Sequence, residues 1–153
     1  MIVSVSLPHP GRSCSASITE NYRLEIVKAN GLNPLLRLLQ SPDPGSISSA
    51  VSCVGYLSGR YANGSLIIEA GFLQPLVKLL AFKDSEMVQY CAAGALRNLA
   101  ASIENRGDIV NAGTVQSIKE LVLHVPVRIQ IQMTYCIECL SSSGMHSPLS
   151  HLI

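Results

Sequence analysis

The segment ANGLNPLLRLL at residues 29–39 returns along the chain as AGFLQPLVKLL at 70–80 and, more faintly, as AGTVQSIKELV at 112–122. When the three copies are aligned on their first alanine, the spacings between them are 41 and 42 residues. All-helical solenoids repeat with a period of roughly 40 to 47 residues. The period therefore predicts a stack of helical repeats, a class of fold whose extended surfaces bind other proteins.

The flanks of the three copies repeat in the same register. An asparagine followed by an apolar pair precedes each copy, at Asn21, Asn63 and Asn105. A longer apolar segment follows each copy beyond a loop, at 46–59, 85–102 and 127–144. The pattern thus predicts that each unit contains a short, a medium and a long helix. We expect a divergent, flexible segment at 1–18, repeats at about 19–60, 61–102 and 103–142, and a tail at 143–153.

The long helix of the middle unit is predicted to have two faces. Its apolar residues recur at the spacings of a buried helical stripe, namely Val88, Cys91, Ala92, Ala95, Leu96 and Leu99. Ser85 is placed to cap the start of this helix. The other face carries Met87, Tyr90, Gly94, Arg97, Asn98 and Ala101 at steps of three and four residues. We expect that face to be the binding surface.

These segments resemble the armadillo-repeat family. The resemblance is carried by IVKANGLNPLLRLLQS at 26–41, IIEAGFLQPLVKLL at 67–80 and ALRNLAAS at 95–102. The segment LVLHVPVRIQIQMT at 121–134 makes the chain most similar to the fungal vacuolar branch of that family. The similarity runs nearly continuously from about Asn21 to about Leu140. It implies an all-α fold, a right-handed α-solenoid of about three armadillo repeats with no strands.

The resemblance implies an adaptor and no enzyme. Members of this branch join the vacuolar membrane to partner proteins in vacuole inheritance and fusion, nucleus to vacuole contact, and cytoplasm-to-vacuole targeting in autophagy. Armadillo grooves receive extended peptides, and an asparagine on the third helix hydrogen-bonds the peptide main chain. Only Asn98 matches that asparagine here. Tyr56 and Cys139 stand at the corresponding positions, so the row of asparagines is broken on both sides.

Nuclear-import receptors with the same repeat carry a tryptophan one turn before the groove asparagine, where its ring meets a lysine cation. This chain has no tryptophan. Recognition of a basic localisation signal is therefore not expected, and Arg97 would add one positive charge to the groove. The candidate groove residues are Asn98, Arg97, Tyr90, Gly94, Met87, Tyr56, Ser52, Tyr135 and Glu138.

The composition favours one piece of a longer array. Charged residues make up 14% of the chain, against roughly 25% in average soluble domains. Three repeats are about the minimum for a stable stack, whose terminal repeats need a polar outer face. Neither terminus supplies one, so we expect a fragment that self-associates through uncapped ends. The alternative is a small protein whose termini cap it in another way. With 11 basic and 10 acidic residues, no nucleic-acid partner is expected.

The targeting signals point to indirect membrane contact. Ile2 follows Met1, so the glycine that myristoylation requires is absent. Cys14 is either an acylation site or a plain thiol. No apolar run approaches the 18 or so residues of a membrane span. We expect a cytoplasmic chain, or one at the cytosolic face of the vacuolar membrane if it is part of a full-length protein.

The five cysteines favour packing over chemistry. Cys53 and Cys136 align with Ala95, which predicts small buried residues in preference to zinc ligands. The histidines have no partner at catalytic spacing, and no cofactor is expected. Two hypotheses stay open: an adaptor that binds peptides around Asn98, and a structural or non-functional repeat fragment without partner binding of its own.

Overall fold

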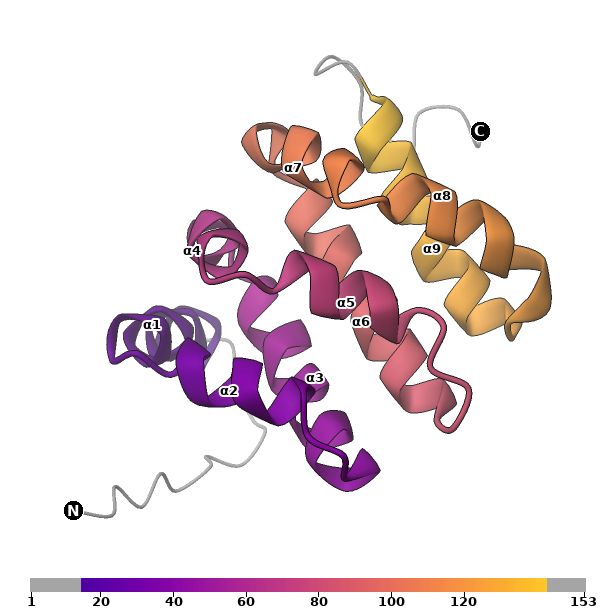
Figure 1. Ribbon diagram of the computed structural model, residues 1–153. Helices are drawn as coiled ribbons and strands as arrows, with labels where there is room; N and C mark the ends of the chain where they lie inside the picture. The colour runs from indigo at the N-terminus through magenta and orange to yellow at the C-terminus, as the bar shows by residue number, and fades with distance from the viewer. Residues whose placement is uncertain (1–14, 143–153) are drawn as a thin grey trace.

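The computed structural model describes residues 15–142, which form nine α-helices and no strand (Figure 1). The first three are α1 (Ser15–Lys28), α2 (Leu32–Leu39) and α3 (Pro44–Ser58). The next three are α4 (Gly64–Glu69), α5 (Leu73–Leu79) and α6 (Glu86–Ala100). The last three are α7 (Arg106–Asn111), α8 (Thr114–Leu121) and α9 (Val127–Ser141). The prediction of an all-α solenoid is confirmed.

The three triplets of helices stack in parallel layers. In Figure 1, α2, α5 and α8 lie in front, and the long helices α3, α6 and α9 run behind them. The most extensive packing between triplets joins α3 to α6 and α6 to α9. The long helices therefore form one continuous layer, whose outer face is available to other molecules.

A left-handed backbone turn joins the short helix to the medium helix in every repeat. Gly71 has φ 92° and Gly113 has φ 85°, and Asn30 takes the corresponding place in the first repeat with φ 64°. Glycine adopts positive φ without strain, and asparagine tolerates it better than most residues. The repeated Ala-Gly or Ala-Asn pair thus marks the corner of each unit.

The asparagines that precede the second and third copies are structural. Asn63 and Asn105 are buried. Asn63 Nδ2 donates to the carbonyl of Leu57 at 3.0 Å, and Asn105 Nδ2 donates to the carbonyl of Leu99 at 3.1 Å. These carbonyls belong to the last turns of α3 and α6, where they also accept the amides of Arg60 and Ser102 at 3.3 Å in place of regular helical bonds. Each asparagine therefore closes a long helix as the next repeat begins.

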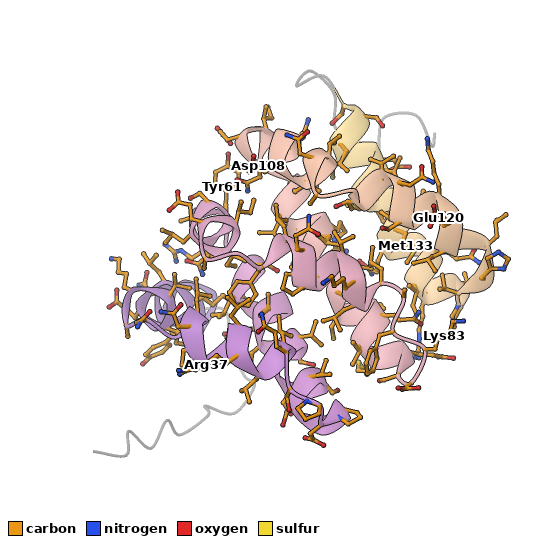
Figure 2. The ribbon with its side chains drawn as sticks, viewed as in Figure 1. Arg37, Tyr61, Lys83, Asp108, Glu120 and Met133 are labelled. Carbon is orange, nitrogen blue, oxygen red and sulfur yellow. The ribbon has the colours of Figure 1, made fainter. Side chains whose placement is uncertain are left out.

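The predicted stripe of α6 is buried with one exception. Val88, Leu96 and Leu99 have at most 1% of their surface exposed, whereas Cys91 is half-buried. Ser85 caps the helix by accepting from the amide of Val88 at 3.3 Å, as predicted. Figure 2 shows side chains from all three layers, and its Met133 is wholly buried.

Two helix starts differ from the expected positions. The first short helix was expected near residue 20, and α1 begins at Ser15. The first long helix was expected at 46, and α3 begins at Pro44. Asp43 explains the second difference because its carboxylate accepts from the amide of Ser46 at 2.8 Å. Proline in the first turn loses no helical hydrogen bond.

Replacing Gly71 by alanine should lower the free energy of unfolding by about 1 to 2 kcal/mol, the cost of a left-handed conformation for a residue with Cβ. The nearest atom to the added Cβ would be Leu36 Cδ2 at 4.0 Å, so the cost is conformational and no clash contributes. Gly107→Ala in α7 is the matched control, because its Cβ meets nothing within 4 Å. Alanine there should be neutral or stabilising. Urea unfolding of both variants checks the difference.

Candidate functional site

The nine candidate groove residues lie on the long helices, and the structure divides most of them among three hollows. Ser52 and Tyr56 belong to α3, five residues belong to α6, and Tyr135 and Glu138 belong to α9. The five on α6 are Met87, Tyr90, Gly94, Arg97 and Asn98. We call the surface that these nine residues form the long-helix face.

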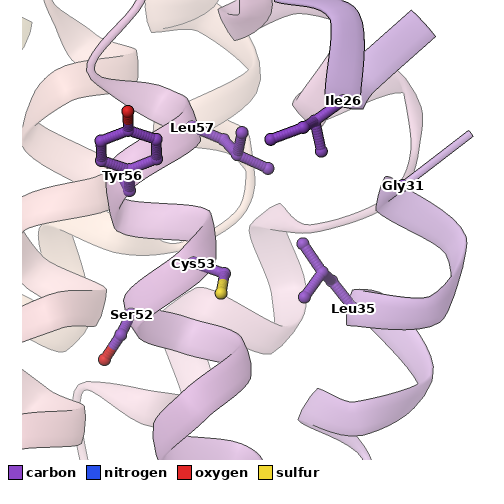
Figure 3. A pocket seen from close by; sticks show the side chains of 7 residues that line it. All are labelled: Ile26, Gly31, Leu35, Ser52, Cys53, Tyr56 and Leu57. Carbon is purple, nitrogen blue, oxygen red and sulfur yellow. The ribbon is translucent and has the colours of Figure 1, made fainter. Parts of the chain in front are cut away.

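The first hollow lies between α3 and the α1–α2 corner and measures about 400 Å³. Figure 3 shows Ser52 and Tyr56 on one helix, with Ile26 and Leu35 across the hollow. The Arg23 guanidinium lies 4.0 Å from the centre of the Tyr56 ring, a cation–π distance. The positive charge of Arg23 thus lies over the ring of Tyr56, the residue that stands in place of the groove asparagine.

The second hollow lies between α6 and α9 and measures about 270 Å³. Its lining is formed by Met87, Tyr90 and Arg128. Arg128 donates to a carboxylate oxygen of Glu86 at 2.6 Å, which pairs the two helices across the hollow. The sequence did not single out Arg128, although the alignment of repeats places it beside the predicted face.

The third hollow lies on the outer side of α9 and measures about 460 Å³. Tyr135 and Glu138 line it together with four residues that the sequence did not identify, Val127, Gln130, Ile131 and Thr134. Spacings of three and four residues along α9 connect all six. They therefore form one stripe of the helix surface.

Asn98 is held by hydrogen bonds within the protein. Its Nδ2 donates to Ser58 Oγ at 3.2 Å and to the carbonyl of Gly55 at 3.5 Å, both on α3. Its Oδ1 accepts from Arg97 Nη2 at 2.9 Å. Asn98 therefore ties α6 to α3, a structural role that the sequence did not predict. An amide oxygen has two lone pairs, so Oδ1 has room for one further donor.

Gln132 is a second amide on this face that the sequence missed. Its Nε2 donates to Tyr90 Oη at 3.4 Å across the boundary of α6 and α9. Its Oε1 is buried and has no hydrogen-bond partner among the described residues. A Cβ at Gly94 would lie 3.9 Å from that oxygen. A methyl group at Gly94 would thus make an ordinary van der Waals contact with this unsatisfied acceptor.

The two aligned cysteines differ in burial. Cys136 is wholly buried as predicted. Burial raises the pKa of the Cys136 thiol to about 12, with a further increase from Cys139 and a small opposing effect from Arg97. The prediction that Cys53 is buried is wrong, because its side chain is exposed beside the first hollow. In the first repeat, no described helix covers the side of α3 on which Cys53 lies.

Within residues 15–142, no helix is both long enough and apolar enough to cross a membrane.

Comparison with known proteins identifies the repeat. The family described as armadillo/beta-catenin-like repeat matches residues 19–59 and 65–101. Vacuolar protein 8 of Saccharomyces cerevisiae is 44% identical over 79% of this chain, and that of Yarrowia lipolytica is 48% identical over 79%. Vacuolar protein 8 of Candida albicans is 41% identical over 95% of this chain. The chain spans only 21% to 27% of the length of these relatives.

Solved structures with the same fold are designed armadillo proteins. One, a designed armadillo repeat protein in complex with the peptide (KR)4, superposes with a TM-score of 0.74 at 26% identity. The match covers 78% of this chain and 51% of that one. Another, a computationally designed armadillo repeat protein for modular peptide recognition, has a TM-score of 0.75 at 26% identity. This match covers 80% of this chain and 53% of the designed one.

Proposed function

Because the chain belongs to the armadillo/beta-catenin-like repeat family, we propose that it is a protein-binding adaptor. In this proposal, the long-helix face receives extended segments of partner proteins. Support comes from the designed armadillo protein that was solved with a peptide. Further support comes from the large side chains that remain exposed on this face, among them Tyr56, Met87 and Tyr90.

The hollow between α6 and α9 is the observation that carries the proposal. It combines the thioether of Met87 and the ring of Tyr90 with the guanidinium of Arg128. Such a lining suits an apolar or aromatic peptide side chain with a neighbouring carbonyl or carboxylate, because arginine donates to both. Its volume of about 270 Å³ is enough for one side chain of the partner.

Asn98 would fix the register of the peptide through one hydrogen bond. Both of its amide protons are directed at α3, and its oxygen already accepts from Arg97. The remaining lone pair of Oδ1 is free to accept a main-chain N–H. A second bond, from Nδ2 to a peptide carbonyl, would require Asn98 to release Gly55 or Ser58. We therefore propose a single main-chain bond at this position.

The wider role follows from the relatives and is part of the proposal. Their name, vacuolar protein 8, supports a vacuolar context for the proposed adaptor. The full-length protein would join the cytosolic face of the vacuolar membrane to partners in vacuole inheritance, fusion, nucleus to vacuole contact and autophagy.

A structural role is the second candidate, and the bonding of Asn98 favours it. A side chain whose hydrogen bonds are already made within the protein has less to offer a ligand. In that case the three repeats would only space other parts of a longer array. Peptide binding separates the two candidates.

Replacing Asn98 by alanine should weaken peptide binding by roughly fivefold to a hundredfold, because an unpaired buried amide of the peptide costs about 1 to 3 kcal/mol. The probes are peptides selected from a random phage-displayed library against the whole chain, with affinity measured by fluorescence anisotropy. The (KR)4 peptide should bind more weakly than the selected ones, since Ser52, Gly94 and Tyr135 stand where import receptors carry tryptophan.

Ser58→Ala is the matched control for Asn98→Ala. It removes a hydrogen bond between α3 and α6 but leaves the Asn98 amide in place on the long-helix face. Both variants should lose similar stability, of order 1 kcal/mol. Only Asn98→Ala should lose affinity. Equal affinity of both variants for every selected peptide would contradict the groove assignment and support the structural role.

A further inference from the structure

The two ends of the described stack expose opposite halves of one interface. Inside the stack, α3 packs against α6, and α6 packs against α9 in the same way. Each long helix therefore has a rear side, which contacts the preceding repeat, and a front side, which contacts the following one. The rear side of α3 and the front side of α9 have no such neighbour among residues 15–142.

Burial at equivalent positions identifies the two sides. On the rear side, Ala95 of α6 and Cys136 of α9 have 0% of their surface exposed, whereas the equivalent Cys53 of α3 is exposed. On the front side, the exposed fraction is 0% for Val51 of α3 and 1% for Ala93 of α6. The equivalent Thr134 of α9 is exposed. The same two positions are thus covered wherever a neighbouring repeat is present.

A hydrogen bond between α3 and α6 shows how front and rear meet. The carbonyl of Gly55 on the front of α3 accepts from Asn98 on the rear of α6. Glu138 is the equivalent of Gly55 on the front of α9, and Tyr56 is the equivalent of Asn98 on the rear of α3. If a second copy docks in the way that neighbouring repeats pack inside the stack, Glu138 of one chain therefore lies against Tyr56 of the next.

The charges at these two positions are complementary. Arg23 lies on the ring of Tyr56 at 4.0 Å. Arg23 thus brings a positive charge to one end of the stack, and Glu138 brings a negative charge to the other. Opposite charges that meet across an interface favour the correct partner and orientation.

The shapes of the two ends are complementary as well. The front of α9 carries Ile131 and Tyr135, larger than the equivalent Ser48 and Ser52 of α3. The rear of α3 carries the small Ser49 and Cys53 beside a hollow of about 400 Å³. Large side chains at one end thus face small ones and open space at the other, as close packing requires.

From these observations we propose that the chain assembles head to tail with a second copy of itself, α9 of one chain docking against α1 and α3 of the next. The contact is heterologous, since different surfaces of the two chains meet. It leaves one front and one rear free, so further copies can add. This proposal rests on the packing between repeats, and it shares Tyr56 and Glu138 with the long-helix face.

Sedimentation velocity of the whole 153-residue chain tests the proposal. The average mass of the unmodified chain should rise with concentration. Glu138→Arg and Arg23→Glu should each weaken association by about tenfold or more, because each places like charges together. An equimolar mixture of the two variants should associate like the unmodified chain. The arginine at 138 of one variant meets the glutamate at 23 of the other, and the unchanged Glu138 and Arg23 meet at the alternate junctions, so only junctions between identical variants are repulsive.

Two charge reversals serve as controls. Glu69→Arg and Lys78→Glu alter residues that stay exposed in the middle repeat, where both neighbours are present, so they lie outside the interface. Both should associate like the unmodified chain. A monomer at all concentrations would overturn the proposal. Failure of the mixed variants to associate, with both folded by circular dichroism, would also overturn it.

Discussion

Replacing Leu96 by alanine should lower the free energy of unfolding by about 2 to 5 kcal/mol, the range for truncating a buried leucine. Leu96 lies in the middle of α6, the helix that packs against both α3 and α9, and 0% of its surface is exposed. The cavity would form where the three repeats meet. A loss of this size is a large fraction of the 5 to 15 kcal/mol that roughly stabilises whole domains. Urea unfolding followed by circular dichroism measures it.

Leu38→Ala is the matched control, because Leu38 is also a helical leucine but has 41% of its surface exposed. It should cost much less than Leu96→Ala, since less apolar surface leaves the interior and no closed cavity forms. Similar losses for the two variants would mean that α6 is not the centre of the packed core. The comparison with Asn98→Ala is also informative, because that change removes hydrogen bonds and little packing.

The sequence predicted those features that depend on one repeat alone. The repeat period, the corner between the short and medium helices, and the helix cap are local features. The backbone at Gly71 needs positive φ, and Ser85 accepts from an amide three residues ahead. The buried stripe of α6 was predictable because its apolar residues recur at helical spacing. These properties follow from residue type and spacing, which a single sequence displays.

Features that depend on the neighbouring repeat were not predicted. Cys53 and Cys136 share a repeat position, yet only Cys136 has a repeat packed on that side. Asn98 matches the groove pattern, yet its amide bonds α3 because Ser58 and the carbonyl of Gly55 lie within reach. The Arg23 contact with Tyr56 joins two helices whose relative placement no periodicity specifies. The candidate site lies at these junctions between repeats. The sequence therefore identified its residues but not the hydrogen bonds and contacts that they make.

The Cys136 thiol should make the fold sensitive to alkali. Its pKa is raised from an ordinary value of 9.0 to about 12 because the side chain is buried between α6 and α9. Above pH 9 the unfolded chain releases this proton while the folded chain retains it. The unfolded state then binds fewer protons, so stability falls as pH rises. The loss should be about 1.4 kcal/mol for each pH unit between 9 and 12, since that is the value of one pKa unit.

Cys136→Ala isolates this effect from the lysines and tyrosines that also titrate in alkali. Alanine is the natural choice, because Ala95 fills the equivalent position of α6 without exposure. Unfolding by urea should be measured for both proteins at pH 7, 9 and 10.5. Below pH 9 the variant should be somewhat less stable, since it loses the buried sulfur. At pH 10.5 the difference should shrink or reverse by about 2 kcal/mol. A difference that stays constant from pH 7 to 10.5 would show that the Cys136 thiol ionises equally easily in the folded and unfolded chains, and hence that the junction of α6 and α9 admits water.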